Sequence, residues 1–142
     1  MATKPPPQNP VLPEQRELFD LFVKKWQGLL NLSDWRLIKK GGKTKYMAEM
    51  VLMETKHKLA TYRLGHDFGE TPVNAKSLES TAIHELLHLR LHELTEIAIS
   101  ELMYSDAVLA VEHSVITVLE NLLMELATRQ TAEEAASYGG TD

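Results

Sequence analysis

The segment HELLH at residues 84–88 constrains this chain more than any other feature, and it lies in a leucine-rich run that predicts a helix. On a helix, His84 and His88 lie on one face, about 6 Å from each other along the axis. Both imidazoles can therefore bind one metal ion, and Glu85 can reach a water molecule on that ion. The alternative is a pair of structural histidines. Because leucines cover much of the circumference, two neutral imidazoles there need hydrogen-bond partners or a metal, and we predict a metal site.

The composition is that of one modest domain, since 142 residues can bury a core without disulfides. The chain has no cysteine, which excludes disulfides, Cys-rich zinc sites and cysteine nucleophiles. A net charge of −5 without any basic stripe argues against a nucleic-acid partner. The apolar runs are short and interrupted by charge, and the N-terminus lacks the apolar core of a signal peptide. We therefore predict a cytoplasmic protein without a membrane partner; its oligomeric state stays open.

Prolines and polar residues predict the domain boundaries. Residues 1–13 hold five of the six prolines and few core-forming side chains, which predicts an extended or disordered lead-in. Residues 14–130 form the single predicted domain. Its first helix begins after Pro13, ends near Gly28 and contributes Trp26 to the core. Residues 131–142 are polar and are predicted to form a flexible tail.

Alternating apolar residues and turn signals predict three strands, at residues 35–40, 46–53 and 59–65. Their connections are short, so we expect a mainly antiparallel sheet, with the second strand at its centre because both of its faces are apolar. The motif helix follows, capped by Asn74 or Ser77, and is expected to bend between residues 94 and 100. The pair Ser105 and Asp106 predicts the start of a last helix, at residues 107–128. The predicted fold class is α+β: a helix, three strands, the motif helix and a C-terminal helix.

A catalytic zinc site needs a third protein ligand besides two histidines. His92 continues the series on the motif helix, but it lies about 12 Å along the axis from His84, too far to share one ion. On the last helix, Glu112 falls inside an apolar face, where a carboxylate is costly unless it is paired or binds a metal. We predict Glu112 as the third ligand, with His113 as the alternative and Glu120 as a hydrogen-bond acceptor for a ligand histidine. An ion pair of Glu112 with Lys or Arg is the remaining interpretation. The apolar face consists of Val108, Val111, Val115, Val118, Leu119, Leu122 and Leu126.

A helix with the pattern HExxH, followed by a glutamate on the next helix, resembles the gluzincin type of zinc metallopeptidase. The chain is similar to the minimal gluzincins and to phage- or prophage-encoded metallopeptidases, over about residues 35–126. The resemblance implies a zincin-like fold and a Zn²⁺ ion held by His84, His88 and Glu112, with Glu85 as the general base. It also implies that the third predicted strand is the sheet edge along which an extended peptide docks, and that a phage-encoded copy would work in the host cytoplasm.

The expected function is therefore zinc-dependent hydrolysis of a peptide bond in a peptide or protein substrate. The metal activates a water molecule and Glu85 takes its proton. Tyr104, His113 or Tyr62 could supply a second donor to the oxyanion. One alternative is a zinc-binding but non-catalytic zincin-like protein that acts in phage assembly or host interference. Another is an interaction module without a metal.

Overall fold

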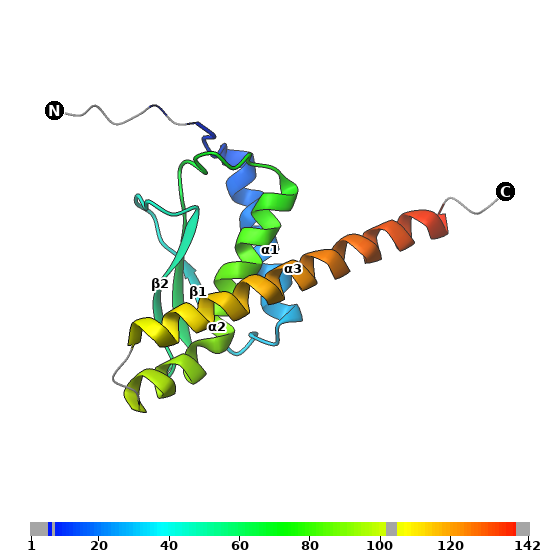
Figure 1. The fold of residues 1–142 in the computed structure, drawn as a ribbon. Coiled ribbons are helices and arrows are strands. Elements are labelled where there is room, and N and C mark those ends of the chain that lie inside the picture. Colours follow the sequence, from blue (N-terminus) through cyan, green and yellow to red (C-terminus); the bar gives the residue numbers. More distant parts are fainter. Residues whose placement is uncertain (1–5, 7, 102–104, 139–142) are drawn as a thin grey trace.

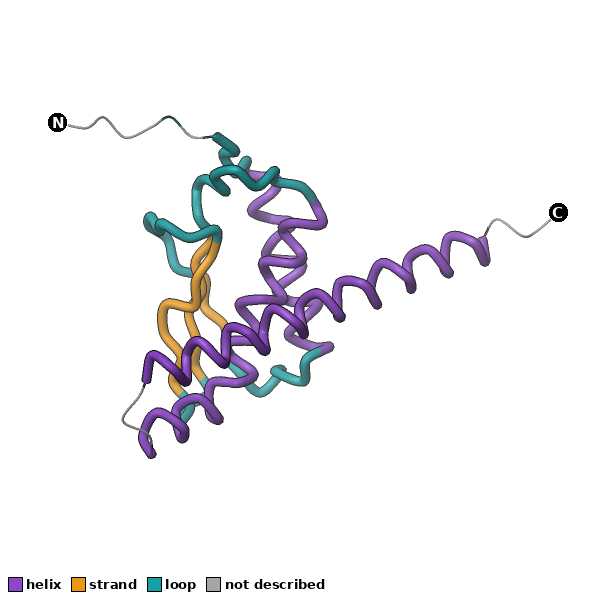
Figure 2. The backbone as a smooth tube through the Cα atoms, viewed as in Figure 1, coloured by secondary structure: helices purple, strands orange, loops and turns teal. Residues whose placement is uncertain are grey.

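The computed structural model describes residue 6, residues 8–101 and residues 105–138, and it confirms the predicted α+β class (Figures 1 and 2). The predicted order of helix, three strands and two helices is also confirmed. Within the described residues, the elements are α1 (Pro13–Leu29), β1 (Arg36–Lys39), β2 (Ala48–Glu54), β3 (Leu59–Leu64), α2 (Ala75–Glu101) and α3 (Ser105–Tyr138).

The three strands form a mixed sheet in the order β1-β3-β2, so two predictions about the sheet are wrong. Strands β2 and β3 form an antiparallel hairpin, but β1 pairs with β3 in parallel, with Leu37 opposite Ala60. The sheet therefore has β3 at its centre, and β2, predicted to be central, is an edge strand. The prediction assumed that the apolar residues on both faces of β2 are buried in the sheet. In the structure several of them line a cleft, described below, and Leu52 is exposed. The resemblance implied that β3 is the edge on which a peptide docks. Because β3 pairs with a strand on each side, it has no free edge for a peptide.

The core lies between the sheet and the two helices α1 and α2. Strand β3 alternates strictly, with Ala60, Tyr62 and Leu64 buried on the side that faces the helices. Phe19 of α1 packs against Tyr62, with ring centroids 6.1 Å apart. Trp26 is buried as predicted, and its indole N–H donates to Glu79 of α2 at 2.8 Å. Because α1 and the sheet both pack against α2, the first half of α2 is fixed by contacts on more than one side.

Helix α2 begins where its capping residues predict. Asn74 and Ser77 cap it reciprocally: the Ser77 N–H donates to Asn74 Oδ1 at 2.9 Å, and the Asn74 N–H donates to Ser77 Oγ at 3.0 Å. The helix then continues without interruption to Glu101, through the segment where a bend was predicted. Figure 1 shows its axis turning in the C-terminal part while the helix persists.

Within the predicted lead-in, residues 8–11 are attached to the loop that follows β3. Pro10 forms an antiparallel bridge with Asp67. The Val11 N–H donates to the His66 carbonyl at 2.8 Å, and the Asn9 N–H donates to the Asp67 carboxylate at 2.9 Å. Residues 1–5 and 7 lie outside the described residues.

Helix α3 is longer than predicted, since it runs to Tyr138 instead of ending near residue 128. The predicted flexible tail is therefore helical up to Tyr138, and its last residues, 139–142, lie outside the described residues. Figure 1 shows α3 crossing α2 and then projecting away from the rest of the fold. Within the described chain, α3 is also the one helix long and apolar enough, by length and composition alone, to cross a membrane, with a mean hydropathy of 1.5 over an 18-residue window. Glu112 and Glu120 nevertheless interrupt the apolar residues of this stretch.

Candidate metal centre

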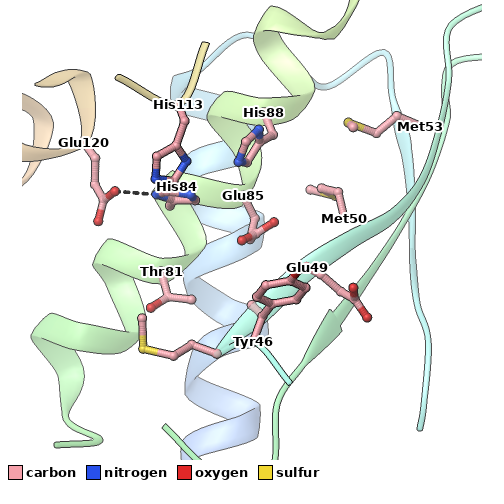
Figure 3. Close-up of a pocket in the computed structure, with 12 residues that line it drawn as sticks. Tyr46, Glu49, Met50, Met53, Thr81, His84, Glu85, His88, His113 and Glu120 are labelled. Carbon is pink, nitrogen blue, oxygen red and sulfur yellow. Dashed lines mark hydrogen bonds and ion pairs between the residues drawn. The ribbon is translucent and has the colours of Figure 1, made fainter. Parts of the chain in front are cut away.

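Three histidines from two helices converge beside the sheet (Figure 3). His84 and His88 project from α2, and His113 projects from α3 where the two helices pack together. One ring nitrogen of each lies within 4.8 Å of one ring nitrogen of the other two. The ring of His84 lies 5.0 Å from that of His88 and 5.1 Å from that of His113, measured between centroids. Three imidazoles this close can share one metal ion.

Two carboxylates of α3 orient the histidines of α2. His84 Nδ1 lies 2.7 Å from Glu120, and His88 Nδ1 lies 2.6 Å from Glu112. A carboxylate at Nδ1 favours the tautomer that carries its proton there, and this leaves the Nε2 lone pair of each ring free for a metal. This arrangement is typical of metal-binding histidines.

The two carboxylates are themselves held by hydroxyl groups of α2. The Ser80 hydroxyl donates to Glu120, and the Thr95 hydroxyl donates to the second oxygen of Glu112 at 3.1 Å. Glu120 thus contacts His84, one of the two histidines that were predicted to bind the metal. Glu112 has the same kind of contact with His88.

The structure places His113, and not the predicted Glu112, in the group of nitrogens that could hold a metal. Glu112, the predicted ligand, reaches the site but lies at Nδ1 of His88, outside the group of converging nitrogens. The alternative residue, His113, belongs to that group. The cause is the rotation of α3 about its axis, because Ile116 is buried against the core and not the valines of the predicted apolar face.

Glu85 is buried between α2 and β2, with 8% of its surface exposed. Burial raises the pKa of this carboxyl to about 7, even though the nearby His84 and a hydrogen bond from the Met50 backbone lower it. The pairing of β2 with β3 shifts register between Met50 and Leu52, a β-bulge beside the N–H that reaches Glu85. The carboxyl is therefore fixed next to the histidines and titrates near neutral pH.

His84 and His88 respond differently to their surroundings. The hydrogen bond with Glu120 raises the pKa of His84 above its ordinary value. Burial lowers the pKa of His88, although its hydrogen bond with Glu112 acts in the opposite direction. Burial also tends to raise the pKa of Glu120, but the hydrogen bonds from His84 and Ser80 outweigh it, so that the net pKa is lowered. Glu120 thus favours its charged form, which an imidazole ligand needs as its acceptor.

The histidines and Glu85 open into a cleft of about 600 Å³ between α2, α3 and β2. Its sheet-side wall is mostly apolar, as Figure 3 shows for Tyr46, Met50 and Met53. Gly65 allows the backbone at Tyr46 to approach closely, because a Cβ atom at position 65 would lie 2.4 Å from the Tyr46 carbonyl oxygen. The remaining lining residues are Met47, Ala48, Glu49, Thr81, His84, Glu85, His88, His113 and Glu120.

Not every candidate for a second oxyanion donor lines the cleft. Tyr62 lies in the core, where its hydroxyl donates to Asp20 at 3.0 Å, and it does not line the cleft. Tyr104 lies outside the described residues. Tyr46 does line the cleft, but the sequence showed it only as the first residue of a predicted strand. No signal in the sequence pointed to it, because the wall forms only when the hairpin packs beside α2.

No protein-family model matches this chain, and no curated protein or solved structure is detectably similar to it.

Proposed function

We propose that the chain is a zinc-dependent peptidase in which His84, His88 and His113 hold the metal and Glu85 is the general base. The convergence of three imidazoles beside a buried glutamate carries this proposal. Imidazole nitrogen is a ligand that zinc prefers, and catalytic zinc sites use three protein ligands. With a histidine as third ligand, the site departs from the glutamate of the gluzincin pattern.

Glu85 is suited to moving a proton at its carboxylate. When bound, zinc would supply a Lewis acid and lower the pKa of a coordinated water molecule to about 7. Burial brings the pKa of Glu85 to about 7 in the metal-free chain, so the carboxylate is a stronger base than an exposed glutamate. The carboxyl can accept a proton from water and then return it to the leaving amine. The Met50 N–H keeps the carboxyl aimed at the cleft.

An extended peptide is the substrate that the cleft favours. Strand β2 is a sheet edge beside Glu85, and an edge strand offers unpaired backbone groups to a peptide. Met50 and Met53 line the same wall, so we expect a preference for an apolar side chain near the cleaved bond. Tyr46 is the donor we propose for the developing oxyanion.

The test is cleavage of a peptide library by zinc-loaded protein, with Glu85→Gln as the variant and Glu49→Gln as the matched control. Glu49 also lines the cleft but pairs with Arg63 at 2.8 Å. We expect Glu85→Gln to bind zinc as the wild type does and to lose at least about 100-fold in rate. Glu49→Gln should stay within a few-fold of the wild type. Full activity in Glu85→Gln, or no cleavage by zinc-loaded wild type, would contradict the proposal.

A zinc-binding protein without catalysis is the second candidate, and the exposed apolar side chains of α3 favour it. Such side chains are typical of interaction surfaces. Zinc at one ion per chain without turnover of any peptide would select this candidate.

A further inference from the structure

The side of α3 that the fold leaves uncovered is apolar. Five aliphatic residues at spacings of three and four form one stripe along about 22 Å of the helix. On a helical wheel the stripe is centred roughly 120° from the buried Ile116. Each of the five leaves between 42% and 65% of its surface exposed: Val111, Val115, Val118, Leu122 and Leu126. We call these five residues the α3 stripe.

The α3 stripe is comparable to the largest apolar patch that a monomer usually exposes. Five half-exposed aliphatic residues present on the order of 500 Å² of apolar surface, at the upper end of what monomers expose. Two such stripes facing each other would bury on the order of 1,000 Å², which is the size at which specific interfaces begin. A second copy of the chain therefore matches the stripe in both area and chemistry.

We propose that two copies of the chain pair through the α3 stripe, with the two helices antiparallel. The residues Val111, Val115, Val118 and Leu122 follow the four-three-four spacing of a two-stranded coiled-coil seam. Charges fix the orientation, because Glu125 and Arg129 continue the same side of the helix toward its C-terminal end. Parallel helices would place each of these charges opposite its own copy, whereas antiparallel helices keep the copies apart.

A membrane fits the α3 stripe less well. Helices that lie on anionic membranes carry lysine and arginine on their polar side, but α3 has six acidic residues and Arg129 as its one cation. A membrane-spanning α3 would place Glu112, His113 and Glu120 in hydrocarbon, although all three contact α2 or line the cleft. A protein partner satisfies the stripe without moving these residues.

This pairing does not depend on the proposed zinc site, because the stripe and His113 lie on different sides of α3. A metal ion at the histidines and a second copy at the stripe would nevertheless both contact α3. The contacts of Ile116 and of the two glutamates hold one side of α3, and a second copy would hold the other.

The test is the mass of the full chain by analytical ultracentrifugation with chelator present, between about 1 and 100 µM, where an interface of this size is expected to dissociate. We expect the wild type to shift from 16.0 kDa toward twice that mass. The double variant Val118→Lys, Leu122→Lys should stay at the monomer mass. The control Leu21→Lys, on the exposed side of α1, should pair as the wild type does.

Circular dichroism must show unchanged helix content in each variant; if the lysine pair unfolds, the milder pair Val118→Ser, Leu122→Ser replaces it. A monomeric wild type throughout the range would overturn the proposal. So would a double variant that still pairs. Binding of a monomeric wild type to vesicles of phosphatidylserine and phosphatidylcholine would assign the stripe to a membrane instead.

Discussion

Helices α2 and α3 are both long and rich in aliphatic residues, yet the fold buries many residues of α2 and few of α3. Nine residues of α2 are buried, among them Leu78, Leu86 and Leu89. In α3, which is longer, the buried residues are Glu112 and Ile116. The difference arises because α2 lies between α1, the sheet and α3, whereas α3 packs on α2 alone among elements with substantial contacts.

This difference divides the candidate metal centre into two halves. His84 and His88 belong to a helix that the core holds, so their positions follow from packing. His113 belongs to a helix that polar contacts at the site itself hold in place, through Glu120 and Glu112. A metal ion bound by all three histidines would therefore tie the loosely held helix to the rigid one.

The largest effect is expected from removing core packing of α2. Leu86 is fully buried, and Leu86→Ala should lower the free energy of unfolding by about 2–5 kcal/mol. The control Leu21→Ala, at an exposed leucine, should change it by less than about 0.5 kcal/mol. Urea unfolding measures both. Similar effects of the two substitutions would mean that α2 is not the rigid half.

Zinc should act mainly on α3. At about 1,000 times its dissociation constant, a ligand that binds only the native state adds about 4 kcal/mol of stability. Hydrogen exchange should show slower exchange in α3 around His113 when zinc is added, with little change in the first half of α2. His113→Ala should abolish this response. Equal protection of both helices would remove the distinction between them.

A smaller effect concerns Glu85 in the metal-free protein. Its pKa is raised from 4.5 to about 7, so the folded state binds the proton more tightly than the unfolded state does. The contribution of the protonated carboxyl to the free energy of unfolding is fully present below pH 4.5 and is lost as the pH rises through 7. Glu85→Gln cannot ionise and should therefore be more stable than wild type by up to about 3 kcal/mol at pH 8, and about equal at pH 4.5. Urea unfolding with chelator at both pH values measures this. A difference independent of pH would mean that burial does not govern Glu85.

Much of the fold could be predicted from local patterns. The spacing of His84 and His88 placed both on one side of α2, and Asn74 with Ser77 marked where that helix begins. The order of the strands in the sheet was not predictable in this way, because short connections favour antiparallel neighbours and do not show which strand takes the central place. Strand β3 fills the centre since its hairpin with β2 returns it alongside β1.

The place of His113 beside His84 and His88 could not be predicted because it depends on the rotation of α3. Glu112 and His113 are adjacent, so they differ by about 100° around the helix, and packing decides which one faces His84 and His88 as part of the same group. The prediction assumed that the most apolar side of α3 would be buried. In the structure that side, including Val111 and Val118, is exposed, and the side with Ile116 is buried instead.

The zinc content of purified protein, by elemental mass spectrometry, tests the central claim most directly. The wild type should hold close to one zinc ion per chain, and His113→Ala should lose it. Glu112→Gln should still bind zinc with about 10- to 100-fold weaker affinity, because Glu112 positions His88 and does not bind the metal. Zinc kept in His113→Ala but lost in Glu112→Gln would return the third ligand to Glu112. A wild type without zinc, even after zinc is supplied, would contradict the metal centre itself.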